Sequence, residues 1–249
     1  MQFKDKSVVV TGASTGIGRA AAIAFAKAGA SVTIGDVDVR AKDTATAIQA
    51  DGGQAQFVSC DVTDAAQTTG LVEAALKTFG RLDAAFNNAG ILPAPVPFHE
   101  VETEALNQII EVDLKGVFHC MQAQIRHFLT SGGGAIVNTA SVAGVIADPY
   151  MSAYVAAKHA VVGLSRAAAV EYAQQGIRVN AIAPGLINTP MTSQWLADPE
   201  FTAAMYAHNV IGRAGQPEEI AGTVLHLCSD AASFTNGSVV VVDGGQTAH

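Results

Sequence analysis

The sequence predicts an α/β protein with a doubly wound, mostly parallel sheet of seven strands that carries helices on both faces. Short β-branched runs alternate with longer alanine-rich segments of helical period along the whole chain. The predicted strands are apolar throughout, without polar residues at alternate positions, which is typical of parallel strands buried on both faces. In such a sheet, right-handed crossovers place ligands at the carboxyl ends of the strands.

The first half of the chain alternates strands and helices regularly. Short apolar runs predict strands at residues 7–10, 31–35, 56–60 and 82–86. Helical periodicity predicts helices at residues 17–28, 39–50 and 65–79. Gly29 ends the first of these helices and Gly52 follows the second, because glycine commonly terminates a helix.

The second half continues this alternation with longer helices. We expect helices at residues 102–129, 152–174 and 217–228, and strands at residues 135–139, 178–182 and 238–242. A run of three glycines ending at Gly134 leads into the first of these strands. No linker, repeat or low-complexity segment interrupts the pattern, so we expect residues 1–249 to form one domain.

Composition limits the classes of partner and compartment. The chain has 249 residues, of which 49% are hydrophobic and 14% charged, enough apolar material for a large core. Its net charge of −8 argues against nucleic acid as the main partner, and no apolar run is long enough to span a membrane. Scattered cysteines and the lack of a signal-peptide pattern favour a reduced, cytoplasmic protein. The seven histidines show no cluster, so we expect no metal site.

A glycine-rich turn follows the first predicted strand and opens the first predicted helix. Glycines let the backbone turn sharply and approach a ligand, and the helix N-terminus offers free N–H groups to a pyrophosphate. The spacing is Gly-x-x-x-Gly-x-Gly and lacks the Gly-Lys-Ser/Thr ending of a nucleoside-triphosphate loop. We therefore expect this turn to bind a dinucleotide through Gly12, Ser14, Thr15, Gly16, Ile17 and Gly18.

Asp36 ends the second predicted strand, at the position where a carboxylate accepts the ribose hydroxyls of an adenosine. Such a carboxylate would repel a 2′-phosphate. Thr15, not Lys or Arg, precedes Gly16, and Val37 follows Asp36. These features favour NAD over NADP. The alternative is that Asp36 only caps the next turn.

Tyr154 and Lys158 stand four residues apart in an alanine-rich segment without glycine or proline, so they share one face of a predicted helix. Ser141 lies thirteen residues before Tyr154, at the end of a predicted strand. The ammonium beside the phenol should pull the tyrosine pKa from about 10 towards neutrality. A phenol tuned in this way exchanges protons with alcohols and ketones. The alternative is an ordinary helix surface.

These features occur in the order seen in one large enzyme family, which the chain resembles from Lys6 to Gly245. The motifs are the turn 11–18, Cys60-Asp61-Val62, Asn87-Asn88-Ala89-Gly90, Ser141, Tyr154 with Lys158, Pro184-Gly185 and Val242-Asp243-Gly244-Gly245. On these motifs the chain resembles the classical short-chain dehydrogenase/reductase family. The resemblance implies a Rossmann fold, a homotetramer and hydride transfer between NAD(P) and an alcohol or ketone.

The resemblance also implies residues that contact the cofactor. Asp61 and Val62 would bind the adenine, and Asn88, Ala89 and Gly90 would line the adenosine ribose. Pro184, Gly185, Ile187 and Thr189 would hold the nicotinamide and pyrophosphate. The alternative is that Asp61-Val62 and Pro184-Gly185 are ordinary strand exits.

The resemblance assigns Ser141 to orient the substrate oxygen, Tyr154 to exchange its proton, and Lys158 to lower the tyrosine pKa and bind the nicotinamide ribose. Asp113 departs from the family pattern, which usually has Asn there as part of a proton relay. The acid keeps the shape and an acceptor oxygen but adds charge and loses the amide donor. We expect Asp113 to occupy the relay position.

Residues 189–212 form a long insert with Trp195, Phe201, Met205 and Tyr206, which we expect to close over the substrate as a lid. The predicted pocket is apolar and has no Arg or Lys to hold a carboxylate, so we expect a neutral, fairly hydrophobic secondary alcohol or ketone. One alternative is an NADPH-dependent 3-oxoacyl-thioester reductase, which Asp36 disfavours. Another is a non-catalytic nucleotide-binding regulator, which would not need Ser141, Tyr154 and Lys158.

Overall fold

The computed structural model describes residues 2–248 and contains a seven-stranded sheet in the order β3-β2-β1-β4-β5-β6-β7. Every neighbouring pair is parallel, so the sheet is parallel throughout. The chain starts in the middle of the sheet, runs outward to β3 and returns to β4, which leaves a crevice at the carboxyl ends of β1 and β4. The strands are β1 (Ser7–Thr11), β2 (Ser31–Asp36), β3 (Gln54–Ser59), β4 (Ala84–Asn87), β5 (Gly134–Thr139), β6 (Ile177–Pro184) and β7 (Val239–Val242).

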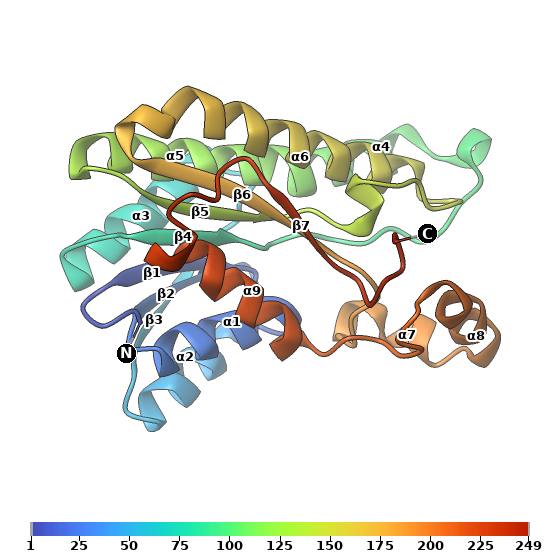
Figure 1. The fold of residues 1–249 in the computed structure, drawn as a ribbon, viewed down its shortest axis with the longest axis horizontal. Helices are drawn as coiled ribbons and strands as arrows, with labels where there is room; N and C mark the ends of the chain where they lie inside the picture. Colours follow the sequence, from blue (N-terminus) through green and yellow to red (C-terminus); the bar gives the residue numbers. More distant parts are fainter. Residues whose placement is uncertain (1, 249) are drawn as a thin grey trace.

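Helices cover both faces of the sheet (Figure 1). One layer contains α1 (Gly16–Lys27), α2 (Ala41–Ala50) and α9 (Pro217–Cys228). The other contains α3 (Ala65–Phe79), α5 (Gly116–Ser131) and α6 (Ser152–Tyr172). The predicted architecture is therefore confirmed.

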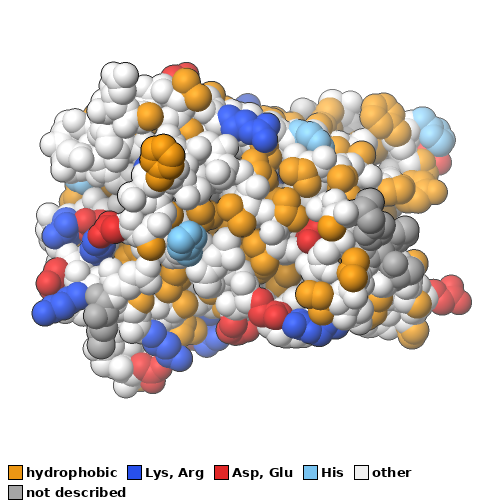
Figure 2. Space-filling model, viewed as in Figure 1, with side chains coloured by type: hydrophobic (Ala, Val, Ile, Leu, Met, Phe, Trp, Pro, Cys, Tyr) orange, Lys and Arg blue, Asp and Glu red, His pale blue; other side chains and the backbone are white. Residues whose placement is uncertain are grey.

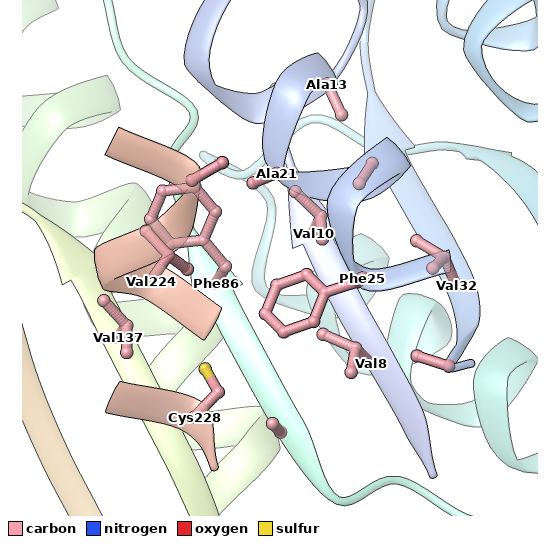
Figure 3. Close-up of a cluster of buried hydrophobic side chains, with 14 of the residues drawn as sticks. Val8, Val10, Ala13, Ala21, Phe25, Val32, Phe86, Val137, Val224 and Cys228 are labelled. Carbon is pink, nitrogen blue, oxygen red and sulfur yellow. The ribbon is translucent and has the colours of Figure 1, made fainter. Parts of the chain in front are cut away.

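The layer of α1 and α9 packs on the sheet through a cluster of buried apolar side chains. Phe25 from α1 and Phe86 from β4 are both completely buried and lie in this cluster (Figure 3). Their neighbours come from three strands and both helices: Val8, Val10, Val32, Val137, Ala21, Val224 and Cys228. Because such interiors are close-packed, this contact holds the start of α1 against the end of β1.

The largest difference from the expected helices lies in the segment predicted as one helix at residues 102–129. The structure has α4 (Thr103–Ile109), a π-helical segment η2 (Ile110–Lys115) and then α5. A π segment adds a residue to the turn without breaking the helix, so hydrophobic periodicity gives little warning of it. Asp113 lies in this segment and its side chain is completely buried.

The insert at residues 189–212 also contains helices that periodicity did not predict. After η5 (Pro190–Thr192), the chain forms α7 (Ser193–Leu196) and α8 (Pro199–His208), which lie at one end of the sheet, apart from both helical layers (Figure 1). The rings of Trp195 and Phe201 pack with centroids 5.2 Å apart. The side chain of Met205 lies outside the described residues.

The remaining helical segments are short 3₁₀ turns: η1 (Phe98–Glu100), η3 (Val142–Gly144), η4 (Ala173–Gln175) and η6 (Asp230–Ala232). Two predicted helices, at residues 65–79 and 217–228, have the expected bounds, and most other elements differ from the expected ones by one or two residues at either end. Within residues 2–248, no helix combines the length and apolar character needed to cross a membrane.

Candidate active site

The predicted phosphate-binding turn joins β1 to α1 with a backbone that only glycine adopts easily. Gly12 and Gly16 have φ values of 67° and 55°. A Cβ on Gly18 would lie 2.1 Å from the carbonyl oxygen of Gly12, so the turn is closed tightly on itself. The N-cap residue of α1, Thr15, makes no side-chain hydrogen bond to the helix, and the first turn has no acidic residue. The N-terminal N–H groups and the positive end of the helix dipole therefore suit a pyrophosphate.

Asp36 ends β2 and ties the phosphate-binding turn to the next loop. Its Oδ2 accepts the backbone N–H of Ser14 and its Oδ1 that of Asp38, both at 2.9 Å. Asp36 therefore caps the next turn, and a ribose contact, which would add to these hydrogen bonds, remains a prediction. The Arg40 guanidinium nearby is bound to Asp38, and this hydrogen bond holds the pKa of the Asp38 carboxyl below its usual value.

The segment after β4 packs against the end of β1, as the doubly wound topology requires. The backbone N–H groups of Asn88 and Ala89 donate to the Thr11 hydroxyl, and Asn88 Nδ2 donates to the Gly12 carbonyl at 3.0 Å. A Cβ on Gly12 would lie 2.7 Å from Ala89 Cα. The structure therefore brings the predicted ribose-lining segment to the phosphate-binding turn.

The segment after β6 also reaches the phosphate-binding turn. Pro184 is the last residue of the strand, and Ile187 forms a bridge with Gly215. A Cβ on Gly16 would lie 3.1 Å from Cγ2 of Thr189, so the predicted nicotinamide-side segment lies beside the start of α1. A Cβ on Gly185 would lie 2.9 Å from Asp243, which explains a glycine there.

Asp61 and Val62 follow β3, and their contacts are those of an ordinary loop that leaves a strand. Asp61 Oδ1 accepts the N–H and hydroxyl of Thr63, and the Val62 carbonyl oxygen lies 3.1 Å from His119 Nδ1. Val62 is buried against Gly116, where a Cβ would lie 2.6 Å from it. An adenine contact remains a prediction.

Lys158 lies at the centre of a buried cluster at the end of β5. Its Nζ is 5.4 Å from the centroid of the Tyr154 ring, as their shared helix face predicts. The same nitrogen donates to the Thr139 carbonyl at 3.1 Å and pairs with Asp113 Oδ2 at 3.0 Å. Ser141, just beyond β5, lies close enough to Tyr154 to lower the pKa of the phenol.

The net pKa shift of Tyr154 has the opposite sign to the one predicted. Burial raises the pKa of the phenol most; Lys158 lowers it, as expected, but Asp113 raises it again, and the net pKa lies above the ordinary value. For Lys158, burial lowers the pKa, but the negative charges of Asp113 and of ionised Tyr154 outweigh it. Lys158 is therefore an ammonium in this protein.

Sequence reasoning missed two contributors to the cluster. The Thr139 carbonyl, which positions Lys158, is a backbone group, and no residue pattern reveals it. Asp148, in the loop before α6, raises the pKa of Tyr154, and its own pKa is raised by burial. In the sequence, the presence of a carboxylate between Ser141 and Tyr154 could have indicated this contribution.

A groove of about 500 Å³ lies next to the cluster and shares Asp148 with it. It runs between Phe98, Tyr150 and the α6 residues Val155 and Ala156. Val155 and Ala156 lie on a different face of α6 from Tyr154, because residues one and two apart on a helix do not share a face. The groove therefore lies on another face of α6 than the phenol. Tyr150 itself is exposed and is not part of the cluster.

Comparisons with known proteins agree with this geometry. A family profile described as Enoyl-(Acyl carrier protein) reductase matches residues 12–247. The cis-4-hydroxycyclohexanecarboxylate dehydrogenase of Sinomonas cyclohexanicum is 45% identical, over 99% of this chain and 98% of its own. The cyclohexanol dehydrogenase of Acinetobacter sp. strain SE19 is 43% identical, over 99% and 96%. A Beutenbergia cavernae crystal structure with NADP bound at low occupancy is 38% identical over all of both chains, with a TM-score of 0.94.

The chain belongs to the short-chain dehydrogenase/reductase family. It is an oxidoreductase that acts on CH–OH groups with a nicotinamide dinucleotide, NAD or NADP.

Proposed function

We propose that this protein interconverts a neutral, fairly hydrophobic cyclic secondary alcohol and its ketone, with NAD as the preferred cofactor. The observation that carries the proposal is the convergence of Ser141, Tyr154 and Lys158 beside the strand ends that form the dinucleotide crevice. Such a cluster supplies what the carbonyl–alcohol conversion needs from the protein, namely a proton donor and acceptor beside a fixed positive charge.

Each residue of the cluster has a distinct role in this proposal. The Ser141 hydroxyl donates a hydrogen bond that orients the substrate oxygen. Tyr154 gives a proton to that oxygen during ketone reduction and takes one during alcohol oxidation. Lys158 supplies positive charge to the phenol and directs an N–H to the nicotinamide ribose. The nicotinamide, when bound, supplies the redox chemistry.

The dinucleotide would be held by residues from five strand ends and by Tyr154 and Lys158 on α6. The turn after β1 would bind the pyrophosphate and Asp36 the adenosine ribose, and the segments after β3, β4 and β6 would complete the site. The proposed set is Gly12, Ser14, Thr15, Gly16, Ile17, Gly18, Asp36, Asp61, Val62, Asn88, Ala89, Gly90, Tyr154, Lys158, Pro184, Gly185, Ile187 and Thr189.

Substrate choice follows from the insert and from the relatives. Residues 189–212 contain Trp195 and Phe201 but neither Lys nor Arg, and Asp148 adds negative charge near Tyr154. These features disfavour a carboxylate such as the one named for the Sinomonas relative, and favour a ring alcohol such as cyclohexanol. We propose that α7 and α8 form the lid that excludes water from this substrate.

The test is a comparison of initial rates of cyclohexanol oxidation with NAD and with NADP, followed by nicotinamide absorbance. We expect NAD to be preferred because Asp36 repels a 2′-phosphate and Arg40 is engaged by Asp38. Asp36→Asn, which keeps one acceptor oxygen and removes the charge, should reduce that preference by about tenfold or more. Equal use of both cofactors by the unaltered protein would refute the NAD assignment.

The second candidate is an NADPH-dependent 3-oxoacyl-thioester reductase. The matching family profile, whose description concerns acyl-carrier-protein substrates, is the observation in its favour. Acetoacetyl-coenzyme A with NADPH is the matched assay. A rate well above that of cyclohexanone with NADH would replace our first assignment with this one.

Assembly and location belong to the same proposal. Exposed apolar side chains on α5 and α6, including Phe118 and Val170, and Phe234 before β7 support a homotetramer. The three free and buried cysteines suit a reducing compartment such as the cytoplasm.

A further inference from the structure

Asp113 and Lys158 are the two most deeply buried charged side chains in the described part of the chain. Asp113 is completely buried and the Lys158 side chain is 3% exposed, whereas Asp36, the next most buried, is 8% exposed. Two charges removed from water in this way are tolerated only when they pair closely. The 3.0 Å contact between them is therefore what allows both charges to be buried here.

The protein encloses the Asp113 carboxylate on several sides. The backbone N–H of Ile91 donates to Oδ1 at 2.8 Å, and Lys158 Nζ forms an ion pair with Oδ2 at 3.0 Å. Gly90 packs so closely that a Cβ there would lie 3.1 Å from Oδ2. The π segment η2 carries Asp113 into this position, and such segments are frequent at functional sites.

The N–H groups of Lys158 are partly used to hold the side chain in place and partly left for the proposed chemistry. An ammonium has three N–H groups. One donates to the Thr139 carbonyl, and the ammonium pairs with Asp113 as its counter-charge, so within the described residues donor capacity remains for the side of Tyr154. The pair therefore fixes the position of the ammonium without using all of its donors.

An acid and an amide at position 113 have different electrostatic consequences. An amide has one acceptor oxygen, and if the Ile91 N–H keeps it, the NH₂ group faces Lys158 and cannot pair with it. The acid accepts the Ile91 N–H through Oδ1, forms an ion pair with Lys158 through Oδ2 and contributes a full negative charge. The catalytic cluster of this chain therefore has one negative charge more than it would have with an isosteric amide.

We propose that Asp113 is a positioning residue that acts as an internal counter-ion to Lys158 and thereby weakens the effect of this ammonium on the proton of Tyr154. The titratable groups that face Tyr154 are Lys158 on the same helix, Asp113 on η2 and Asp148 in the preceding loop. Burial raises the pKa of Tyr154 most, Asp113 and Asp148 add to it, and Lys158 and the Ser141 hydroxyl oppose it.

The counter-ion has a direct effect on the direction of the reaction, which rests on the function proposed above. Below its pKa the phenol can give a proton to a ketone oxygen, and above it the phenolate can take a proton from an alcohol. Because the counter-ion weakens the effect of Lys158, alcohol oxidation should require more alkaline solution in this chain than it would with an amide at position 113.

The test is an absorbance titration of tyrosinate in the protein without cofactor. The chain has four tyrosines. Subtracting the curve of Tyr154→Phe from that of the unaltered protein isolates the titration of Tyr154. The midpoint of this titration is the reference for the variants at positions 113 and 148.

Asp113→Asn is the second arm, measured with and without Tyr154→Phe. Loss of the counter-charge should lower the pKa of Tyr154 by about one unit or more, since a close charge has effects of this size. Asp148→Asn is the matched control, which removes the same charge from a smaller contributor and should lower it less. An unchanged or higher value in Asp113→Asn, with the fold verified by circular dichroism, would contradict the proposal.

Kinetics separate this proposal from the proposed function. In Asp113→Asn the alkaline rise of alcohol oxidation should move to lower pH by the same amount as the titration. If no alcohol is oxidised at all, the function fails while the titration still tests the counter-ion. If turnover is present but neither the titration nor the pH profile moves, only the counter-ion is wrong.

Discussion

At the residue scale, a buried ion pair lies beside the residue that is proposed to exchange the proton. Asp113 and Lys158 lie 3.0 Å apart in the core, and the phenol of Tyr154 is next to them. Removing one partner would leave the other charge buried and uncompensated, at a cost of about 3–5 kcal/mol. Variants of Lys158 therefore report on folding as well as on catalysis, and conservative changes at Tyr154 are the cleaner probe.

Tyr154→Phe should abolish proton exchange and leave the rest of the site in place. The ring is retained, and the contacts of Lys158 to Thr139 and Asp113 do not involve the phenol oxygen. We expect turnover of cyclohexanol to fall by about a thousandfold, the size typical of a lost general acid–base. NAD affinity, measured by calorimetry, should remain nearly unchanged. Near-normal turnover in this variant would show that another group exchanges the proton.

At the scale of elements, the site is assembled by strand ends that converge on the start of α1. The segments after β1, β4 and β6 touch one another through Gly12, Asn88, Gly16 and Thr189. The hydrophobic cluster between α1, α9 and the sheet packs these elements together and so supports this geometry (Figure 3). The turn after β1 is consequently the element least able to accept a larger side chain.

Gly18→Ala tests that conclusion. Its Cβ would lie 2.1 Å from the Gly12 carbonyl oxygen and 2.6 Å from Asn88 Nδ2, so the turn must shift. We expect the dissociation constant for NAD to rise by at least about tenfold and the melting temperature to fall. Gly70→Ala in α3 is the control, because nothing lies within 4 Å of its Cβ, and it should stabilise the fold by about 0.5–1 kcal/mol. Unaltered NAD binding in Gly18→Ala would mean that the turn is not the phosphate site.

At the scale of the whole molecule, apolar side chains remain exposed on a chain with little charge. Figure 2 shows hydrophobic side chains across the middle of one face, with most charged side chains towards its rim. Phe98, Val170 and Phe234 are each more than four-fifths exposed. Exposed apolar surface of this kind is typical of subunit interfaces.

We therefore expect a homotetramer in solution. Sedimentation equilibrium should give about four times the chain mass of 25.5 kDa. Val170→Asp at the exposed end of α6 should shift the population towards smaller species, because a desolvated carboxylate destabilises an apolar contact. A single-chain mass for the unaltered protein at micromolar concentration would contradict the tetramer.

The order of elements and the identity of the main chemical groups were readable from the sequence, because both depend on local information. Hydrophobic periodicity predicted all seven strands and the bounds of α3 and α9. The spacing of Tyr154 and Lys158 predicted their proximity, since a helix imposes it. The π segment was missed because it preserves the helical direction and most of the pattern.

Only the tertiary structure decided the ionisation of the cluster. The sequence placed a cation beside the phenol and therefore predicted a lowered pKa for Tyr154. Folding buries that phenol and brings Asp113 from a distant helix to the same cation, and together these effects raise the pKa. Burial and the distance between charges from different elements are properties of the folded chain, so no local pattern could determine the sign of that shift.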